Sequence, residues 1–243
     1  MMEKTINVYG KNAIRELFKG SRKVYAIYSY LPLDDELSKL AKAKKVDVRI
    51  INKQSFIKEY GDKCGGVVAK AEEYQYYDYN QLIKDCNKDD ATILILANLE
   101  DPHNLGAILR TADATAIDGI IIPKNRSVGL NETVAKVSTG AIEHVKVTQV
   151  VNLNQTIQDL KKNGFWVIGL ELSGTMDYRE APYDGKIALV VGSEGNGIPK
   201  LVLDNCDLVV KIPMYGKVNS LNASVSAALF LYEAKLCKER KNG

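Results

Sequence analysis

The spacing of hydrophobic residues along the chain predicts two α/β regions. In residues 1–71, apolar positions at helical spacing alternate with short strand-like runs. Helices are predicted over residues 12–19, 34–45 and 54–60, and strands over residues 23–28, 46–51 and 65–69. The second of these helices begins with acidic residues and ends in lysines, which suits the helix dipole. This region is predicted to be a small α/β sandwich.

From residue 91 onward, the pattern is strand, loop and helix in repeated succession. Strands are predicted over residues 93–97, 119–122, 144–148, 165–170, 187–191 and 208–212. Helices are predicted over residues 104–116, 132–140, 153–162 and 220–238, with a short one from residue 199. The strands are almost continuously apolar, which indicates a mostly parallel sheet with helices on both faces. Ligands of such sheets bind beyond the carboxyl ends of the strands.

Charge is distributed unevenly between these regions. The 243 residues carry 33 basic and 30 acidic side chains, a net charge of only +3. Residues 1–71 hold 15 basic and 8 acidic residues, whereas residues 72–90 hold 2 and 6, and residues 91–243 hold 16 of each. The basic first domain indicates nucleic acid binding, with an ordinary lysine-rich surface as an equal alternative. Residues 72–90 are predicted to be a linker whose tyrosines pack on one or both domains.

The composition argues against several classes of protein. A hydrophobic fraction of 46% and a charged fraction of 26% are typical of globular domains and not of disordered, collagen-like or coiled-coil chains. The four cysteines form no CxxC pair and there are only two histidines, so neither a zinc site nor a disulfide framework is predicted. The sequence has no signal-peptide core and no membrane-spanning apolar run. We therefore expect a cytoplasmic protein with reduced thiols and no membrane partner.

Three loops that follow predicted strands carry the candidate chemistry. The first contains Asn104 and Arg110 near the start of a predicted helix, where backbone N–H groups favour an anion. The second, residues 191–199, has glycines around Glu194 but matches neither the dinucleotide fingerprint nor the phosphate-binding loop. The third, residues 212–225, leads through a glycine turn into a helix start rich in Ser and Asn. Taken singly, the loops are also consistent with helix caps, an exposed arginine and a plain turn.

In order, spacing and residue type, these loops resemble the three motifs of the SpoU (TrmH-type) branch of the SPOUT RNA methyltransferases. The matching residues are Asn104 and Arg110, then Gly192-Ser193-Glu194-Gly195-x-Gly197, then Ile212-Pro213-Met214 and Ser220-Leu221-Asn222-x-Ser224-Val225. Residues 9–69 resemble the ribosomal-protein-L30e-like substrate-binding domain of the ribosomal-RNA ribose methyltransferases in this family. Cys64-Gly65 departs from the His-Gln-type pair that those relatives usually carry.

The resemblance implies that residues 91–243 form a methyltransferase domain with a deep trefoil knot, in which S-adenosylmethionine binds. The positions that match the cofactor site are Gly192, Ile212, Leu221, Leu170, Glu171, Leu172 and Met214. No metal is expected. The resemblance also implies a homodimer, for which the terminal helix offers apolar residues at helical spacing, namely Val225, Leu229, Tyr232 and Leu236. The same residues are equally suited to packing on their own sheet.

The implied reaction is methyl transfer to a ribose 2′-hydroxyl of RNA. The sulfonium already carries a reactive methyl group, so the protein has to align the hydroxyl and manage its proton and developing charge. Arg110 is expected to stabilise the incipient alkoxide more than to act as a base, because an arginine remains protonated. Asn104 is expected to orient the ribose or the arginine, and Glu194 to anchor its loop and the arginine. Ser220 and Asn222 would complete a hydrogen-bonding wall.

The resemblance leaves more than one RNA target. A guanosine of 23S ribosomal RNA is the first choice, because the L30e-like domain accompanies that specificity. Transfer-RNA ribose methylation and methylation of the ribosomal site that confers antibiotic resistance are alternatives. A ribosome-assembly protein that only binds RNA is disfavoured because all five polar candidates are present, and a nicotinamide dehydrogenase because the fingerprint glycines are absent.

Overall fold

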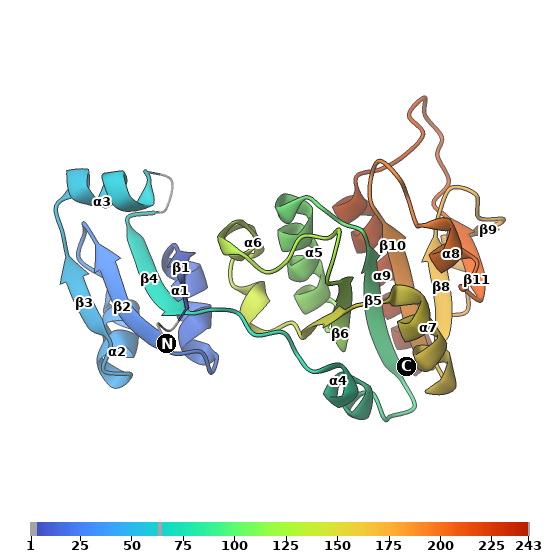
Figure 1. The fold of residues 1–243 in the computed structure, drawn as a ribbon, viewed down its shortest axis with the longest axis horizontal. Helices are drawn as coiled ribbons and strands as arrows, with labels where there is room; N and C mark the ends of the chain where they lie inside the picture. Colours follow the sequence, from blue (N-terminus) through green and yellow to red (C-terminus); the bar gives the residue numbers. More distant parts are fainter. Residues whose placement is uncertain (1–3, 63–64, 243) are drawn as a thin grey trace. The chain divides into compact units, whose positions relative to one another are not determined.

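The computed structural model describes residues 4–62 and 65–242 and divides the chain into two compact units (Figure 1). Unit 1 consists of Met1–Gln75 and Leu130–His144, and unit 2 consists of Tyr76–Gly129 and Val145–Gly243. The chain therefore crosses between the units at three places. Cys64, at which the sequence departs from the family pattern, lies outside the described residues.

Unit 1 is built on a four-stranded sheet. Its elements are β1 (Thr5–Tyr9), α1 (Lys11–Lys19), β2 (Val24–Ser29), α2 (Asp35–Ala43), β3 (Asp47–Ile50), α3 (Lys53–Tyr60), β4 (Val67–Glu72), α6 (Glu132–Ser138) and the short 3-10 helix η1 (Ala141–Glu143). The strand order is β1-β4-β2-β3, in which β4 runs antiparallel to both neighbours and β3 runs parallel to β2. The helices and strands predicted for residues 12–69 are all present, and β1 is a strand that the prediction lacked.

The two faces of this sheet differ because successive strand residues point to opposite sides. On the face covered by α1 and α2, the strands bury Val8, Ile27, Val67, Ala69 and Ala71. On the other face, α3 packs on Val68 through the fully buried Phe56. Side-chain caps start these helices, since Asp34 accepts a hydrogen bond from the Leu37 N–H and Asn52 accepts one from the Ser55 N–H.

The segment 130–144 belongs to unit 1, although the sequence pattern assigned it to the second domain. Glu132 of α6 accepts hydrogen bonds from the Asn7 N–H of edge strand β1 at 3.0 Å and from the Tyr9 hydroxyl at 3.1 Å. Glu143 pairs with Arg22 through two hydrogen bonds of 3.0 and 2.6 Å. The side chains of this pair are only 3% and 11% exposed.

The expected domain boundaries are therefore corrected in two places. Residues 130–144 belong to unit 1 and not to the second domain. The first domain also extends beyond residue 71, to Gln75. In this extension the Tyr74 ring packs on unit 1, with its centre 3.7 Å from the Arg22 guanidinium. Hydrophobic periodicity predicts a helix, but it does not tell which sheet the helix packs on.

The tyrosines of the expected linker pack on both units, which confirms that part of the prediction. Tyr74 belongs to unit 1, whereas Tyr77 and Tyr79 pack against the core of unit 2. The Tyr77 hydroxyl donates to Asp85 at 2.7 Å, and the Tyr79 hydroxyl donates to Asp159 at 2.8 Å. Residues 72–90 are thus divided between the two units and contain a helix of their own, α4 (Tyr79–Asp85).

Unit 2 is a seven-stranded sheet with helices. After α4 its elements are β5 (Ala91–Ala97), α5 (Pro102–Ala114), β6 (Gly119–Pro123), β7 (Val147–Val150), α7 (Leu153–Lys162), β8 (Trp166–Leu170), β9 (Met176–Asp177), η2 (Tyr178–Glu180), β10 (Lys186–Gly192), α8 (Lys200–Leu203), β11 (Leu208–Lys211) and α9 (Ala223–Asn242). The strand order is β7-β6-β5-β10-β8-β11-β9, and every neighbouring pair is parallel. The predicted parallel sheet is confirmed, and the two-residue β9 is an addition.

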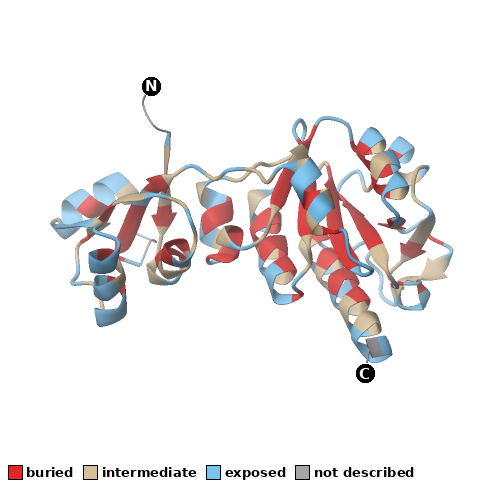
Figure 2. Ribbon diagram, turned by 90° about the horizontal axis from the view of Figure 1, so that it is seen from below, coloured by how far each residue is buried: buried red, intermediate tan, exposed pale blue. Residues whose placement is uncertain are grey.

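The central strands of the unit 2 sheet, β5 and β10, are buried on both faces, as the continuous apolar runs predicted (Figure 2). On one face, Ile93 and Ile95 of β5 join a core with Leu82 of α4 and Ile157 of α7. Helix α9 packs against β10 and α5. Within the described part of the chain, no helix is both long and apolar enough to cross a membrane.

Candidate functional site

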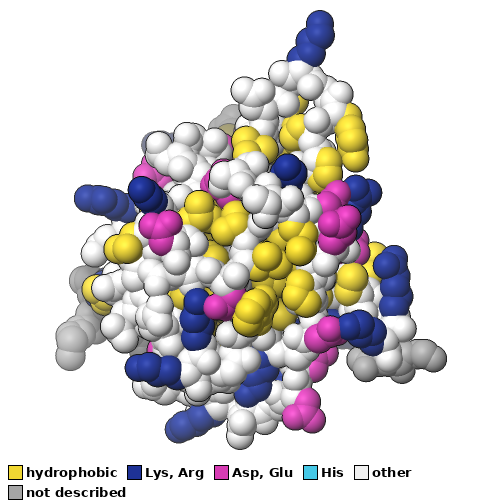
Figure 3. Space-filling view, turned by 90° about the vertical axis from the view of Figure 1, so that its right-hand side faces the viewer, with side chains coloured by type: hydrophobic (Ala, Val, Ile, Leu, Met, Phe, Trp, Pro, Cys, Tyr) yellow, Lys and Arg dark blue, Asp and Glu magenta, His cyan; other side chains and the backbone are white. Residues whose placement is uncertain are grey.

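A cavity of about 670 Å³ opens in unit 2 where β8, β10 and β11 end. Parallel strands present their carboxyl ends at one edge of the sheet, so the loops that follow them meet there. All seven positions that matched a cofactor site line this cavity, namely Gly192, Ile212, Leu221, Leu170, Glu171, Leu172 and Met214. Asn196, Lys200 and Asn219 also line it; they were not predicted, although they stand in or next to the same loops. On the face of unit 2 that forms the right-hand side of Figure 1, hydrophobic side chains gather between charged ones (Figure 3).

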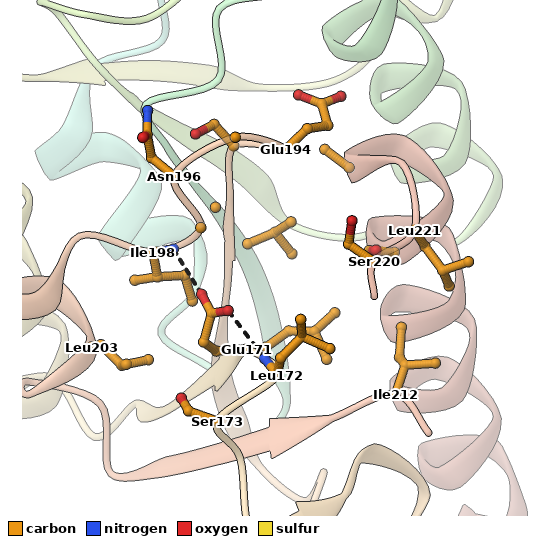
Figure 4. Close-up of a pocket in the computed structure, with 18 of the residues that line it drawn as sticks. Glu171, Leu172, Ser173, Glu194, Asn196, Ile198, Leu203, Ile212, Ser220 and Leu221 are labelled. Carbon is orange, nitrogen blue, oxygen red and sulfur yellow. Dashed lines mark hydrogen bonds between the residues drawn. The ribbon is translucent and has the colours of Figure 1, made fainter. Parts of the chain in front are cut away.

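Glu171 joins two of these loops (Figure 4). One carboxylate oxygen accepts a hydrogen bond from the Leu172 N–H at 3.1 Å, and the other accepts one from the Ile198 N–H at 2.9 Å. The Glu171 N–H in turn donates to the Val210 carbonyl of β11 at 2.9 Å. This side chain therefore fixes the loop after β10 against the end of β8.

The loop after β10 is a tight turn that only glycine permits at two positions. Ser193 and Gly197 exchange backbone hydrogen bonds across it, and Gly197 has a φ of +61°, in the left-handed region. A Cβ atom at Gly192 would overlap the backbone of Gly197, and one at Gly197 would overlap the Glu171 carboxylate. The glycines thus allow two backbone segments and one carboxylate to meet beside the cavity.

Three polar side chains, one from each predicted loop, form a hydrogen-bonded network. The Asn222 amide donates to the Asn104 carbonyl oxygen at 2.9 Å and to the Glu194 carboxylate at 3.3 Å. The Asn104 amide donates to the same Glu194 oxygen. Asn104 is only 6% exposed, although its side chain is polar. The structure thus brings together residues that lie up to 118 positions apart in the sequence.

Helix capping does not explain Asn104. Helix α5 is capped by Asp101, whose carboxylate accepts a hydrogen bond from the His103 N–H at 2.9 Å. The Asn104 side chain is therefore not needed as a cap and bonds to Glu194 and Asn222 instead. Asn222 has both roles, because its carbonyl oxygen accepts from the Ser224 N–H at 2.9 Å and from the Val225 N–H at 3.3 Å. Asn222 therefore caps α9 and links the helix start to the other two loops.

Arg110 and Ser220 are placed differently from these three residues. Arg110 is exposed on α5, is not among the residues that line the cavity, and forms no hydrogen bond or ion pair with the described part of its own chain. The expected anchoring of Arg110 by Glu194 is therefore corrected, since Glu194 binds the two asparagines instead. Ser220 is exposed and lines the cavity.

The thiols and acidic clusters offer no second chemistry at this site. Burial raises the pKa of the Cys86 thiol to about 11 and that of Cys206 to about 12, which makes both unreactive. Cys86, Cys206 and Cys237 are all free thiols. Among the residues that the structure describes, no group of His, Cys, Asp and Glu side chains is arranged to hold a metal ion.

Comparisons with known proteins converge on one family. The SpoU rRNA methylase family model matches residues 91–232. A Staphylococcus aureus protein designated as a TrmH family tRNA/rRNA methyltransferase is 48% identical over 238 residues, which cover 96% of each chain.

Solved structures share the fold of both units. A structure described as an RNA 2′-O ribose methyltransferase has a TM-score of 0.82 and 25% identity, and the match covers 98% of this chain and 90% of that one. An rRNA methyltransferase from Sinorhizobium meliloti with bound AdoMet (S-adenosylmethionine) also has a TM-score of 0.82, at 22% identity, with 96% and 87% covered.

Proposed function

The chain belongs to the SpoU rRNA methylase family of methyltransferases, and we propose that it transfers a methyl group from S-adenosylmethionine to a ribose 2′-hydroxyl of RNA. The observation that carries this proposal is the convergence of three loops on one cavity, next to the network of Asn104, Glu194 and Asn222. The structural relative described as an RNA 2′-O ribose methyltransferase supports the choice of the ribose hydroxyl.

The cavity fits S-adenosylmethionine in size and in chemistry. Its volume of about 670 Å³ lies within the usual range for small-molecule sites, and its lining combines backbone groups with apolar side chains such as Leu170, Ile212 and Leu221. The carboxylates of Glu171 and Glu194 outnumber the single basic residue, Lys200, so the lining favours a cationic ligand. When bound, the cofactor supplies an electrophilic methyl group on a sulfonium.

The residues of this chain have to orient the ribose and offset the charge that develops on its oxygen. The Asn104–Glu194–Asn222 network is joined by hydrogen bonds and reaches the cavity through Glu194, which suits it to holding the ribose hydroxyls. Ser220 adds a hydroxyl on the cavity wall. Arg110 remains the group proposed to stabilise the alkoxide, because a guanidinium stays charged at any pH at which the enzyme works.

The position of Arg110 favours a homodimer. Arg110 is exposed on α5, and α5 packs against α9. Helix α9 exposes an apolar row at helical spacing, in which Val225, Leu229 and Tyr232 are 46%, 37% and 47% exposed and Leu236 is 41% exposed. We propose that two copies pair through this row, and that Arg110 of one copy then serves the site of the other. We also propose that residues 91–243 form a trefoil knot, as the family resemblance implies.

Large-subunit ribosomal RNA is the proposed substrate, with a guanosine of 23S RNA as the first choice. The fold of both units is shared with a structure described as an rRNA methyltransferase, which supports this choice. The Staphylococcus relative is designated for tRNA and rRNA together, so transfer RNA is the second candidate.

Mapping of 2′-O-methyl nucleotides by mass spectrometry tests the proposal. Ribosomal and transfer RNA from cells with and without the protein would be compared, and the missing site restored with purified protein and S-adenosylmethionine. Arg110→Ala is expected to bind the cofactor normally in calorimetry and to lose methyl transfer. Mixing Arg110→Ala with Asn104→Ala chains should restore part of the activity, since one site of the mixed dimer is then intact. No change in any ribose methylation would refute the function.

A further inference from the structure

The sheet of unit 1 carries a row of aromatic and basic side chains on the face opposite α1 and α2. The strand register pairs Tyr9 with Val68, Val68 with Tyr28, and Tyr28 with Arg49, so these four residues form one line across β1, β4, β2 and β3. Lys70 stands on the same face, two residues further along β4. We call these five residues the tyrosine row.

Helix α3 holds the rings of this face in place. The Tyr60 ring lies 5.6 Å from the Tyr28 ring, measured between centroids, at an interplanar angle of 35°. Tyr30, which follows β2, meets the buried Phe56 edge-on at 5.1 Å. Rings that are already fixed lose little conformational freedom when a ligand binds.

A cation stands near each of three rings. The Arg49 guanidinium carbon is 5.7 Å from the centre of the Tyr28 ring, and the Lys53 ammonium is 5.7 Å from the centre of the Tyr30 ring. The ammonium of Lys136, in α6, is 5.9 Å from the centre of the Tyr9 ring. Each ring therefore has a positive charge over it, which a stacking base would displace toward its own phosphate.

Val68 in the middle of the row is buried beneath Phe56, but its four polar or aromatic members reach the surface, and the row is basic in balance. Arg49 and Lys70 are exposed, and Tyr9 and Tyr28 are partly exposed. Asp47 pairs with Arg49 at 2.7 Å, but both side chains are more than half exposed, so a phosphate can compete for the arginine. The surrounding residues 1–71 carry 15 basic and 8 acidic side chains.

We propose that the tyrosine row is a stacking platform for unpaired nucleotides of the RNA substrate, a proposal that rests on the proposed function. Bases would stack on Tyr28 and Tyr9, and phosphates would meet Arg49 and Lys70. Tyr9 and Tyr28 are two strands apart, about 10 Å, which suits the splayed bases of a single strand. A duplex keeps its bases stacked inside and offers no ring face to the tyrosines. The platform therefore selects looped or unfolded RNA around the target ribose.

Binding of a short, mixed-sequence single-stranded RNA that contains 2-aminopurine tests the platform in the full-length chain. Stacking on a tyrosine quenches 2-aminopurine, and this signal is not produced by phosphate contacts alone. Tyr28→Leu keeps apolar packing but removes the ring, and is expected to weaken binding by about tenfold and to reduce the quenching, of which Tyr9 retains a part. Tyr28→Phe keeps the ring and should bind as the unaltered chain does, which guards against an effect of misfolding.

A pair of matched lysine variants tests the phosphate contacts. Lys70→Ala removes a charge from the row, whereas Lys39→Ala removes one from exposed α2 on the other side of the sheet. Lys70→Ala is expected to weaken binding and to lower the slope of log affinity against log salt by about 0.7, as for one phosphate contact on a single strand. Lys39→Ala should leave the slope unchanged.

The platform is refuted if Tyr28→Leu binds the RNA and quenches 2-aminopurine as the unaltered chain does, or if a duplex of the same sequence binds equally well. Neither result touches the methyl-transfer proposal, which is measured separately by cofactor calorimetry and mapping of ribose methylation. If no ribose is methylated but the Tyr28 and Lys70 effects are found, the proposed function fails and the platform stands. A full-length chain that shows no affinity for single-stranded RNA at all would also refute the platform.

Discussion

The cavity of unit 2 is shaped mainly by the backbone of loops, whereas the tyrosine row of unit 1 consists of side chains on regular strands. At the cavity, glycines bring backbone segments together, and the Glu171 carboxylate accepts two backbone N–H groups. On the tyrosine row, regular strands present side chains such as Tyr28 and Arg49. An added methyl group should therefore reduce cofactor binding at the cavity most strongly. At the tyrosine row, the loss of a ring or a charge should reduce RNA binding most strongly.

Gly192→Ala is expected to have the largest effect of any single methyl group. The new Cβ would overlap the backbone of Gly197, so the loop after β10 has to move away from Glu171. Cofactor affinity, measured by calorimetry, is predicted to fall by about a hundredfold or more.

Gly195→Ala is the matched control in the same loop. A Cβ at Gly195 meets no atom within 4 Å, and the residue is not among those with a positive φ. Gly195 also lines the cavity, but the loop keeps its shape in this variant, so the loss of cofactor affinity should be much smaller than in Gly192→Ala. If both variants lose the same cofactor affinity, any added methyl group in this loop weakens binding, and the close approach of Gly192 to Gly197 is not the cause.

Breaking the Arg22–Glu143 pair tests whether the two units are independent in stability. The pair is nearly buried, so Glu143→Gln leaves the guanidinium without its counter-charge, although the Glu72 carbonyl still accepts from it, and should lower the free energy of unfolding of unit 1 by about 3 kcal/mol. The only tryptophan, Trp166, is in β8, so its fluorescence follows unit 2 while far-ultraviolet circular dichroism follows both units. Urea unfolding should then show an earlier circular dichroism transition with unchanged fluorescence.

Lys19→Ala is the control, because its partner Glu16 is on the same helix and the lysine is 61% exposed. Its effect should stay below about 1 kcal/mol. A shift of the Trp166 transition in Glu143→Gln would contradict independent units.

Asn104→Ala is expected to slow methyl transfer more than it weakens cofactor binding. Asn104 bonds to Glu194 and Asn222 but does not line the cavity. Asn104 is buried whereas Glu194 and Asn222 are exposed, so losing its hydrogen bonds should cost about 1–3 kcal/mol at most, and the rate should fall by about ten- to a hundredfold. His103→Ala, at the exposed neighbouring position, should retain the full rate. A large loss of cofactor affinity in Asn104→Ala would instead place Asn104 in the cofactor site.

The sequence predicted structure best where a short segment has a distinctive composition. Continuous apolar strands predicted the sheet, and the glycine-rich and Asn-rich loops predicted the residues that meet at the cavity. The Arg22–Glu143 pair was not predictable, because it joins residues 121 positions apart and neither has an unusual neighbourhood in sequence. The expected Glu194–Arg110 contact does not form within one chain, where one Glu194 oxygen accepts from two asparagines instead. The tyrosine row was hidden because it depends on the register of four strands, which no local pattern specifies.

The smallest effect is expected at Asp85, where unit 2 begins. A hydrogen bond from Lys146, helped by those from Tyr77 and Gln81, lowers the pKa of the Asp85 carboxyl from 3.8 to about 2. Because the folded pKa is the lower one, this group stabilises the fold above about pH 4, and the contribution disappears as the pH falls through about 2. Asp85→Asn should therefore have a slightly lower urea midpoint near neutral pH, and the difference should vanish at the acid end. Asp89→Asn, at an exposed position nearby, is the control. A difference that is constant over this pH range would assign the effect to the lost shape of the side chain and not to its charge.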